Sequence, residues 1–319
     1  MDVTAIGELL IDFTCIDTDS DGYPTMAAHP GGAPANYLAA LAKFGMKTAF
    51  IGKVGEDAFG RLLRQSLENA GIDTRGLISA EDVFTTLAFV TLDDKGDREF
   101  SFARKPGADT ALREEELCRE LIEESRLLHF GTLSLTDEPA RSATYAAVDY
   151  ARSLGKLVSF DPNLRRPLWK REEDAKEQML WGLAHADMVK ISDEELEFLF
   201  GLKPEQGGAY IRQRFGARLV FVTCGAEGCW FSNERAEGFV PALSGIKVID
   251  TTGAGDIFFG SAVARILSLG SAPEALEAKE LREICAFAAA SAGLSATRPG
   301  GISSVPELEE VLEKMKELC

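Results

Sequence analysis

The sequence predicts an α/β fold of three layers, in which helices cover both faces of a mainly parallel sheet and a small discontinuous β-sheet forms a lid. Short apolar runs typical of strands alternate with helical stretches along most of the 319 residues, which is the pattern of parallel sheets. Segments 12–30 and 85–105 break the alternation and are assigned to the lid. No flexible linker divides the chain, so residues 1–319 are expected to form a single domain.

The elements of the main sheet follow one another as strand and helix. Strands are expected at 3–13, 48–54, 127–133, 157–161, 187–191 and 219–223, and helices at 35–44, 59–70, 140–154, 193–200 and 208–214. Segment 244–249 is strand-like and leads into an apolar helix at 257–269, and helical runs follow at 280–294 and 306–318. In such folds, ligands gather at the carboxyl ends of the strands.

The lid is expected to come from two excursions of the chain. Runs 85–92 and 98–104 flank Asp93-Asp94-Lys95-Gly96-Asp97, which is typical of a hairpin turn. Residues 12–30 are irregular and extended, and together the two segments would cover the open face of the sheet. The alternative is an edge hairpin that covers nothing.

Charge and composition exclude several classes of protein. Acidic residues outnumber basic ones by 51 to 34, and the net charge of −17 repels nucleic acid and anionic membranes, so neither is an expected partner. The N-terminus has no signal-peptide pattern and no apolar run approaches the roughly 20 residues that span a bilayer, which favours a cytoplasmic protein. The 6 cysteines form no Cys-x-x-Cys pair, which indicates reduced, mostly buried thiols, with Cys319 exposed, rather than a zinc site.

The run Asp250-Thr251-Thr252-Gly253-Ala254-Gly255-Asp256 carries the strongest chemical signal. It leads into a helix, and the N–H groups and dipole at a helix start can stabilise a developing phosphate charge. Gly253 and Gly255 would let an anion approach the backbone, and Asp256 could orient and deprotonate a substrate hydroxyl. An anion hole beside a base predicts phosphoryl transfer. The alternative is an ordinary glycine-rich turn with a capping aspartate, since the run is neither a Walker A loop nor a dinucleotide fingerprint.

A second glycine motif, Pro30-Gly31-Gly32-Ala33-Pro34-Ala35-Asn36, opens a helix near the start of the chain. Gly31 and Gly32 would let a polyhydroxy ligand lie against the backbone. The amide of Asn36 can both donate to and accept from sugar hydroxyls. Taken alone, such a motif is more often just a turn.

Together, the run from Gly31 to Gly60 and the run from Asp250 to Gly260 resemble the two signatures of ribokinase-like (PfkB-type) carbohydrate kinases. Within that family, residues 31–36 and Pro106-Gly107-Ala108-Asp109 are most similar to fructokinases. The resemblance spans nearly the whole chain and implies a ribokinase-like fold, ATP as the phosphate donor and Mg²⁺ as its metal ion.

The resemblance also implies which residues bind the sugar. Arg98, Phe100 and Arg104 would face it from the lid, on the strand side that they share with Phe102; alternatively, the arginines are merely solvated and Phe100 packs on the apolar side of the flap. Asp12 resembles the family's sugar-binding carboxylate.

Two further charged residues are interpreted differently. Glu8 is expected to be a strand-end or solvent-facing acid. Arg165, in Asp161-Pro162-Asn163-Leu164-Arg165, would approach the substrate or the transferred phosphate, or else pair with a surface acid.

Nucleotide and metal ligands are implied in the same way. In Ser192-Asp193-Glu194-Glu195, Glu195 resembles the Mg²⁺-associated glutamate, although Ser192 stands where the family often has Asn, and helix capping is the alternative. Thr223, Gly225 and Gly228 resemble the nucleotide loop, or else form a hairpin turn. A monovalent-cation site with K⁺ dependence, built largely from backbone carbonyls, is implied for Asp250, Thr252, Ser295, Arg298, Gly300 and Ser304.

The function implied by the resemblance is ATP-dependent phosphorylation of D-fructose to fructose 6-phosphate. Asp256 would be the base, the amides of Gly253, Ala254, Gly255 and Asp256 the anion hole, and two subunits could pair through the lid. A 2-keto-3-deoxygluconate, ribose or nucleoside kinase is an alternative within the enzyme class. A non-catalytic sugar- or nucleotide-binding regulator is the alternative from another class.

Overall fold

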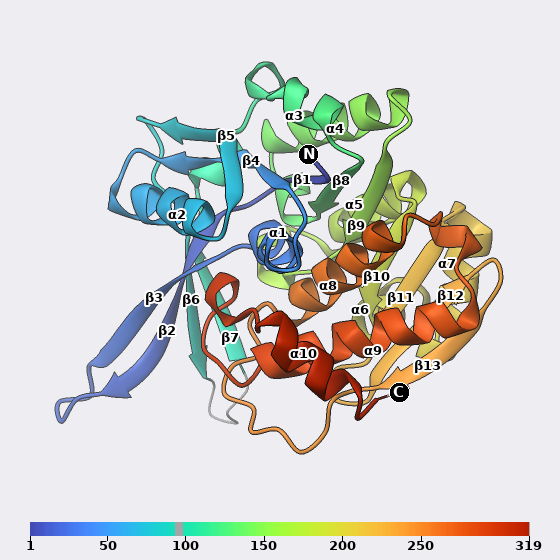
Figure 1. The fold of residues 1–319 in the computed structure, drawn as a ribbon. Helices are drawn as coiled ribbons and strands as arrows, with labels where there is room; N and C mark the ends of the chain where they lie inside the picture. Colours follow the sequence, from blue (N-terminus) through green and yellow to red (C-terminus); the bar gives the residue numbers. More distant parts are fainter. Residues whose placement is uncertain (93–97, 319) are drawn as a thin grey trace.

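A nine-stranded sheet lies at the centre of the described residues, which are 1–92 and 98–318 of a computed structural model, with the side chains of residues 91, 92 and 98–100 excepted (Figure 1). The spatial order is β13 (Glu237–Pro241), β12 (Gly228–Asn233), β11 (Leu219–Thr223), β10 (Met188–Ser192), β9 (Leu157–Asp161), β8 (Leu127–Gly131), β1 (Val3–Ile6), β4 (Thr48–Gly55) and β5 (Ile72–Ala80). Strands β11 to β5 pair in parallel, and β12 and β13 extend the sheet antiparallel.

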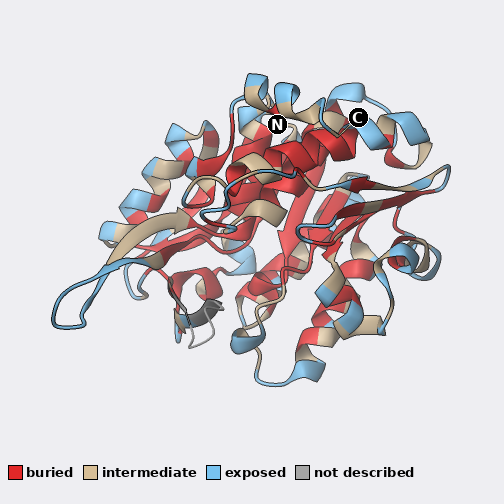
Figure 2. Ribbon diagram, turned by 90° about the horizontal axis from the view of Figure 1, so that it is seen from below, coloured by how far each residue is buried: buried red, intermediate tan, exposed pale blue. Residues whose placement is uncertain are grey.

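Helices cover both faces of this sheet, because its central strands are apolar on both sides. One face packs against α1 (Ala33–Lys43), α2 (Ala58–Asn69), α8 (Ala254–Leu269) and α9 (Ala278–Ser295), and the other against α3 (Arg119–Glu124), α4 (Ala140–Ser153), α5 (Glu172–His185), α6 (Asp193–Phe200) and α7 (Pro204–Phe215). Helix α10 (Leu308–Met315) packs on α9. The buried residues concentrate in the sheet and in the helix faces turned toward it (Figure 2). The predicted three-layer fold is confirmed.

A smaller separate sheet stands beside the large one and contains, in order, β3 (Pro24–Gly31), β2 (Leu10–Thr18), β6 (Leu87–Leu92) and β7 (Arg98–Ala103). β2 and β3 form an antiparallel hairpin that projects from the body of the molecule (Figure 1), and β2 pairs in parallel with β6. The two excursions predicted from the sequence therefore meet in one sheet. The turn predicted at 93–97 lies outside the described residues.

Strands 157–161 and 219–223 and helix 193–200 match their expected bounds, but three expected elements differ. The strand expected at 3–13 is two strands in different sheets, because the chain turns at Gly7, where a Cβ would lie 2.7 Å from the ring of Pro34. Residues 12–30 form a regular hairpin rather than an irregular segment. Segment 244–249 is not a strand; the N–H groups of Ile249 and Asp250 instead donate to the Ala296 carbonyl, at 2.8 and 3.1 Å.

The described cysteines and helices bear on two further expectations. Cys224, Cys229 and Cys285 are buried free thiols, whereas Cys15 is exposed and Cys118 is partly exposed; Cys319 lies outside the described residues. Within the described ranges, no helix combines the length and the apolar character that crossing a membrane requires.

Two aspartates of the main body fix the base of the β6–β7 hairpin. Asp109 accepts hydrogen bonds from Thr86 Oγ1, just before β6, and from Arg104 Nε at 2.8 Å, just after β7. Arg104 also donates to the carbonyl of Leu133 at 2.8 Å, and its side chain is only 3% exposed. Asp57, the N-cap of α2, accepts from the backbone N–H of Thr85 at 2.8 Å. Both ends of the hairpin are therefore tied to the main body.

Replacement of Asp109 by Asn should loosen the base of this hairpin. The variant leaves the buried Arg104 without its nearest charge partner, with Asp137 at 4.0 Å remaining. Breaking a buried ion pair costs roughly 3–5 kcal/mol, and Asn retains part of the hydrogen bonding. We expect a lower melting temperature and faster amide hydrogen exchange at residues 87–90. The exposed pair of Arg75 and Asp73 provides the control Asp73→Asn, which should change neither quantity. Unchanged exchange at 87–90 in Asp109→Asn would show that the hairpin is held by other contacts.

Candidate active site

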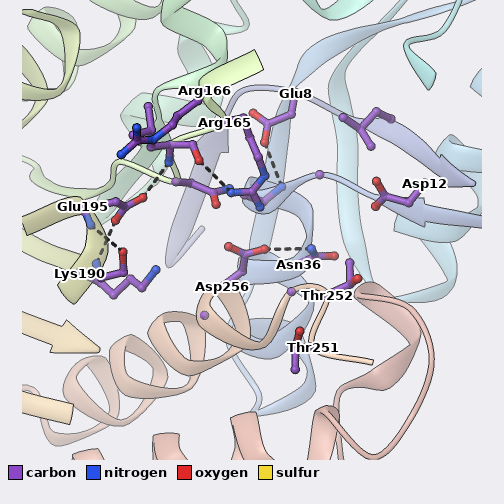
Figure 3. A pocket seen from close by; sticks show the side chains of 18 of the residues that line it. Glu8, Asp12, Asn36, Arg165, Arg166, Lys190, Glu195, Thr251, Thr252 and Asp256 are labelled. Atoms are coloured by element: carbon purple, nitrogen blue, oxygen red, sulfur yellow. Dashed lines mark hydrogen bonds between the residues drawn. The ribbon is translucent and has the colours of Figure 1, made fainter. Parts of the chain in front are cut away.

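A cavity of about 1140 Å³ lies between the two sheets and contains many of the side chains that the sequence singled out (Figure 3). The small sheet lines it with Leu10, Asp12 and Phe102, and the carboxyl end of β10 lines it with Lys190 and Ser192. The N-terminal turns of α1, α6 and α8 and the segments 163–167 and 251–252 complete the lining. This is the edge of the sheet at which α/β folds bind ligands.

The start of α8 opens into the cavity. Gly253 occupies the N-cap position with a φ of 75°, a conformation that favours glycine, and no side chain caps the helix. A Cβ on Gly253 would lie 2.9 Å from Nδ2 of Asn36, so the close approach of α1 also requires a glycine. The N–H of Ala254 donates to the Thr251 carbonyl at 3.2 Å. One of the four amides predicted for the anion hole is therefore engaged within the turn itself.

Asp256, in the first turn of α8, is buried and faces Asn36 of α1. Asn36 Nδ2 donates to Asp256 Oδ2 at 2.9 Å, which joins the two glycine motifs by one hydrogen bond. Burial raises the pKa of Asp256, while the Asn36 hydrogen bond and the charges of Lys190 and Arg165 oppose that rise. The carboxylate is thus held in one place with cations nearby.

Glu8 follows the end of β1, as one of its two predictions expected, but the solvent-facing alternative is wrong. Its side chain lines the cavity and the residue is 2% exposed. Oε1 accepts from the N–H of Ala33 at 3.0 Å, at the start of α1, where the N-cap residue Gly32 has no side chain to offer. Burial raises the pKa of Glu8 to about 7, although backbone hydrogen bonds lower it.

Asp12 lies on β2 against the glycine motif of α1. A Cβ on Gly31 would lie 2.2 Å from Asp12 Oδ2, so Gly31 provides the room that this carboxylate occupies. Burial raises the pKa of Asp12 to about 7, and the positive charge of Arg165 opposes the rise. Arg165 follows β9 and lines the same cavity. Asp12 and Arg165, each predicted separately for the substrate site, therefore line the same cavity.

Lys190 is a buried cation at the carboxyl end of β10. Its Nζ lies 3.1 Å from Asp161 Oδ2 in a pair whose side chains are 7% and 3% exposed. Burial alone would lower the pKa of Lys190, but the carboxylates of Asp161, Glu195 and Asp256 outweigh it and raise the pKa to about 12. A permanent positive charge therefore lies beside the start of α8.

Glu195 lines the cavity and also holds two backbone segments. Its Oε1 accepts from the N–H of Leu164 at 2.7 Å, and its Oε2 from the N–H of Ser192 at 2.9 Å. Ser192 Oγ in turn accepts from the N–H of Glu195 at 3.1 Å, which completes a capping box at the start of α6. Helix capping, the alternative interpretation of this motif, is thus part of what Glu195 does.

Some of the residues predicted for a monovalent-cation site also converge. Asp250 accepts from the N–H of Thr252 and from the N–H of Gly300, both at 2.9 Å, which ties segment 250–252 to Gly300. The other predicted side chains make local bonds: Ser295 Oγ to the Ala292 carbonyl, Ser304 Oγ to the Gly301 carbonyl, and Arg298 to Glu310 at 2.6 Å. Among the described residues, no group of three or more His, Cys, Asp or Glu could hold a metal ion.

The predicted nucleotide loop does not line this cavity. Thr223 ends β11 opposite Ser192, and Gly225 and Gly228 lie in the turn and the start of the antiparallel strand β12, as the hairpin alternative expects. A Cβ on Gly228 would lie 2.2 Å from the Val240 carbonyl, so strand packing alone explains this glycine.

Arg104, which the sequence predicted to face the sugar from the lid, does not lie where it was expected. Arg104 does not line the cavity, because its guanidinium is buried against Asp109 and the segment after β8. Phe102, on the same strand, does line it. The side chains of Arg98 and Phe100 lie outside the described residues.

Comparison with known proteins agrees with this geometry. Residues 1–308 match the pattern of the pfkB family carbohydrate kinases. The chain belongs to the pfkB family. It is 40% identical over 317 residues to fructokinase-1 of Oryza sativa subsp. japonica, with 98% of this chain and 97% of that protein covered.

Two crystal structures of the same fold are also similar to this pfkB protein. Fructokinase from Xylella fastidiosa with bound ATP has a TM-score of 0.89 and 32% identity, with 99% of this chain and 98% of that chain covered. A double mutant of fructokinase from Vibrio cholerae O395, with fructose, ADP and a potassium ion bound, has a TM-score of 0.86 and 30% identity, with 99% and 98% covered. The family predicted from the two glycine motifs is confirmed.

Sequence reasoning missed two buried, charged members of this pfkB cavity. Lys190 is the one charged residue within the strand Met188–Ser192, and a charge in a strand expected to be buried was a signal that could have identified it. Glu8 follows an apolar strand in the same way, but its partner Ala33 lies 25 residues away. A contact at that separation leaves no periodic pattern in the sequence.

Replacement of Asp12 by Asn should stabilise the ligand-free protein at higher pH. Because burial raises the pKa of Asp12 from 3.8 to about 7, the folded protein keeps a proton that the unfolded chain loses in that window, and the free energy of unfolding falls as the pH rises through it. Asn cannot titrate, so the free energy of unfolding of the variant lacks this contribution to its pH dependence. The slope of that contribution is at most about 1.4 kcal/mol per pH unit.

Urea unfolding at about pH 5 and about pH 8 measures the effect. The free energy of unfolding of Asp12→Asn should exceed that of the unmodified protein more at the higher pH than at the lower. Asp149→Asn, on the exposed side of α4, serves as the control. A difference that does not grow with pH would contradict the assigned burial effect.

Proposed function

We propose that this pfkB family protein is an ATP-dependent fructokinase, which converts D-fructose and ATP into fructose 6-phosphate and ADP. The observation that carries the proposal is the buried carboxylate of Asp256, held by Asn36 at the uncapped start of α8. Identity of 40% to a fructokinase over 98% of the chain supports fructose as the substrate.

The sugar would lie against the glycine motif at the start of α1. Gly32 lines the cavity, Gly31 leaves the room that Asp12 occupies, and Asp12 can accept two hydroxyl hydrogen bonds. Asn36, whose Nδ2 holds Asp256, would approach a sugar hydroxyl from the same helix start. Of the residues predicted on the lid, Arg98 and Phe100 stay candidates, whereas Arg104 would act by holding the base of the lid.

Asp256 would position the 6-hydroxyl and take its proton. The bond from O6 to the γ-phosphorus forms as the bond from that phosphorus to the bridging oxygen of ADP breaks, and the hydroxyl proton passes to Asp256 late in the transfer. The amides of Gly253, Gly255 and Asp256 at the helix start would stabilise the charge on the transferred group, with the Ala254 amide shaping the turn. Arg165 would contact the same group.

The nucleotide would extend from the start of α8 toward β10 and β11. Thr223, Gly225 and Gly228 would contact it from beyond the cavity described here, which the pairing of Thr223 with Ser192 permits. Mg²⁺ bound with the nucleotide would neutralise phosphate charge. Because both oxygens of Glu195 already accept backbone N–H groups, this residue would reach the ion through water.

A potassium ion would bind at segment 250–252 and Gly300, joined by Asp250, with Ser295, Arg298 and Ser304 supporting the neighbouring backbone. The potassium-bound structure of the similar Vibrio cholerae enzyme supports this assignment.

We infer in addition that the small sheet acts as a lid on a single catalytic domain. Ile16 and Tyr23, which are 64% and 70% exposed on the projecting hairpin, favour pairing of two subunits there. A cytoplasmic location stays a prediction of the sequence.

A panel of substrates tests the proposal. Phosphorylation of fructose, 2-keto-3-deoxygluconate, ribose, glucose and adenosine is compared by kcat/KM with Mg²⁺ and ATP, with and without potassium. We expect the highest value for fructose and activation by potassium. Preference for another acceptor would reject fructokinase but keep the kinase, and absence of turnover on all of them would favour a binding role.

Asp256→Asn should lower kcat for fructose by roughly 10²–10⁴, the usual contribution of a general base, and leave fructose affinity nearly unchanged. Steady-state kinetics and calorimetric binding of fructose measure the two effects. Asp149→Asn, an exposed aspartate on α4, is the matched control and should retain full activity. If Asp256→Asn turned over as fast as the control, Asp256 would not be the base.

A further inference from the structure

Lys190 is the most buried cation that lines the cavity among the described residues. The other cations, Arg165 and Arg166, are partly exposed and exposed, whereas the Lys190 side chain is 7% exposed. Acids dominate the rest of the charged lining: Glu8, Asp12, Glu194, Glu195 and Asp256. A nucleotide triphosphate is a polyanion, so it needs concentrated positive charge in such a site.

The ammonium of Lys190 lies directly against the first turn of α8. A Cβ added to Gly255 would be 3.0 Å from Nζ and 3.5 Å from Cε, so the glycine leaves just enough room for the lysine. The start of a helix already carries a partial positive charge, and a cation is electrostatically unfavourable there. Asp161 offsets the repulsion, but two sources of positive charge still converge on one point of the cavity.

An ammonium group has three N–H donors. In the described part of the chain, Asp161 is the one recorded hydrogen-bond or ion-pair partner of Nζ, at 3.2 Å to Oδ1 and 3.1 Å to Oδ2. The group can therefore donate to a phosphate oxygen without giving up its partner. Its raised pKa, about 12, keeps it charged throughout.

We propose that Lys190 contacts the phosphoryl group under transfer, opposite the amides of α8, and that Asp161 holds its ammonium in place. The proposal rests on the kinase function proposed above and adds a residue to it. Lys190 supplies charge and a hydrogen bond, and it gives up no proton, since the proton of the sugar hydroxyl goes to Asp256. A compact ammonium that is held in one place can stay in contact with the phosphoryl group while that group passes from ADP to the sugar.

The competing explanation is that Lys190 only neutralises the buried Asp161. The double variant Lys190→Met with Asp161→Asn separates the two roles, because it removes the pair and leaves no unpaired buried charge from it. If Lys190 is a mere counter-ion, the double variant should be nearly as active as the unmodified protein. If Lys190 contacts phosphate, kcat should fall by roughly 10²–10³, as for loss of one transition-state donor.

The affinity for fructose should stay within about threefold in the double variant, since the loss is confined to the phosphate. Fructose binding measured by calorimetry also reports that the variant is folded. Should the variant not fold, Lys190→Gln with Asp161→Asn, which keeps more polar contact, gives the same comparison. The matched control is Lys53→Met with Glu116→Gln, which removes another largely buried pair, at 2.6 Å, outside the cavity, and should keep its kcat.

Activity of the unmodified protein separates the two proposals. If it phosphorylates no acceptor, the proposed function fails. If it is an active kinase and the folded double variant is equally active, the role of Lys190 alone is overturned.

Discussion

The packing of α1 against α8 determines where the polar groups of the cavity lie. Gly260 makes this contact possible, because a Cβ there would be 2.4 Å from the Tyr37 carbonyl and 2.9 Å from Cβ of Ala40. With the helices touching at this point, both N-terminal turns open into one cavity, and Asn36 of α1 reaches Asp256 of α8. The relative position of the two helix starts therefore depends on the close approach of the helices at Gly260.

The cavity provides local positive charge in a chain whose composition is strongly acidic. A chain with a net charge of −17 repels polyanions over most of its surface. Inside the cavity, a helix start, Lys190 and Arg165 provide local positive charge, while burial raises the pKa values of Glu8 and Asp12 to about 7. Near neutral pH these two acids are therefore partly protonated, so the negative charge of the cavity is smaller than its list of acids suggests.

The sequence was informative wherever one short segment carries its own geometry. Gly253 and Asp256 belong to a single helix start, and so do Gly32 and Asn36, so both motifs could be found by their resemblance to known signatures. The alternation of strand and helix patterns predicted the layered fold. The places where sequence reasoning failed depend on distant partners. Arg104 donates to the Leu133 carbonyl, 29 residues away, Glu8 accepts from Ala33, and the ring of Pro34 lies 2.7 Å from where a Cβ on Gly7 would be. Segment 244–249 is mostly exposed and pairs with no strand among the described residues, which its pattern could not reveal.

The attachment of the small sheet has a consequence for the divergence of such proteins. Asp57 and Asp109 accept hydrogen bonds from residues at the base of the β6–β7 hairpin. The β2–β3 hairpin projects from the body of the molecule, and its far end lies in solvent. Changes of sequence or length in the outer halves of these strands therefore need not alter the position of the turn that contains Asp256. The sequences of the two regions can therefore diverge at different rates.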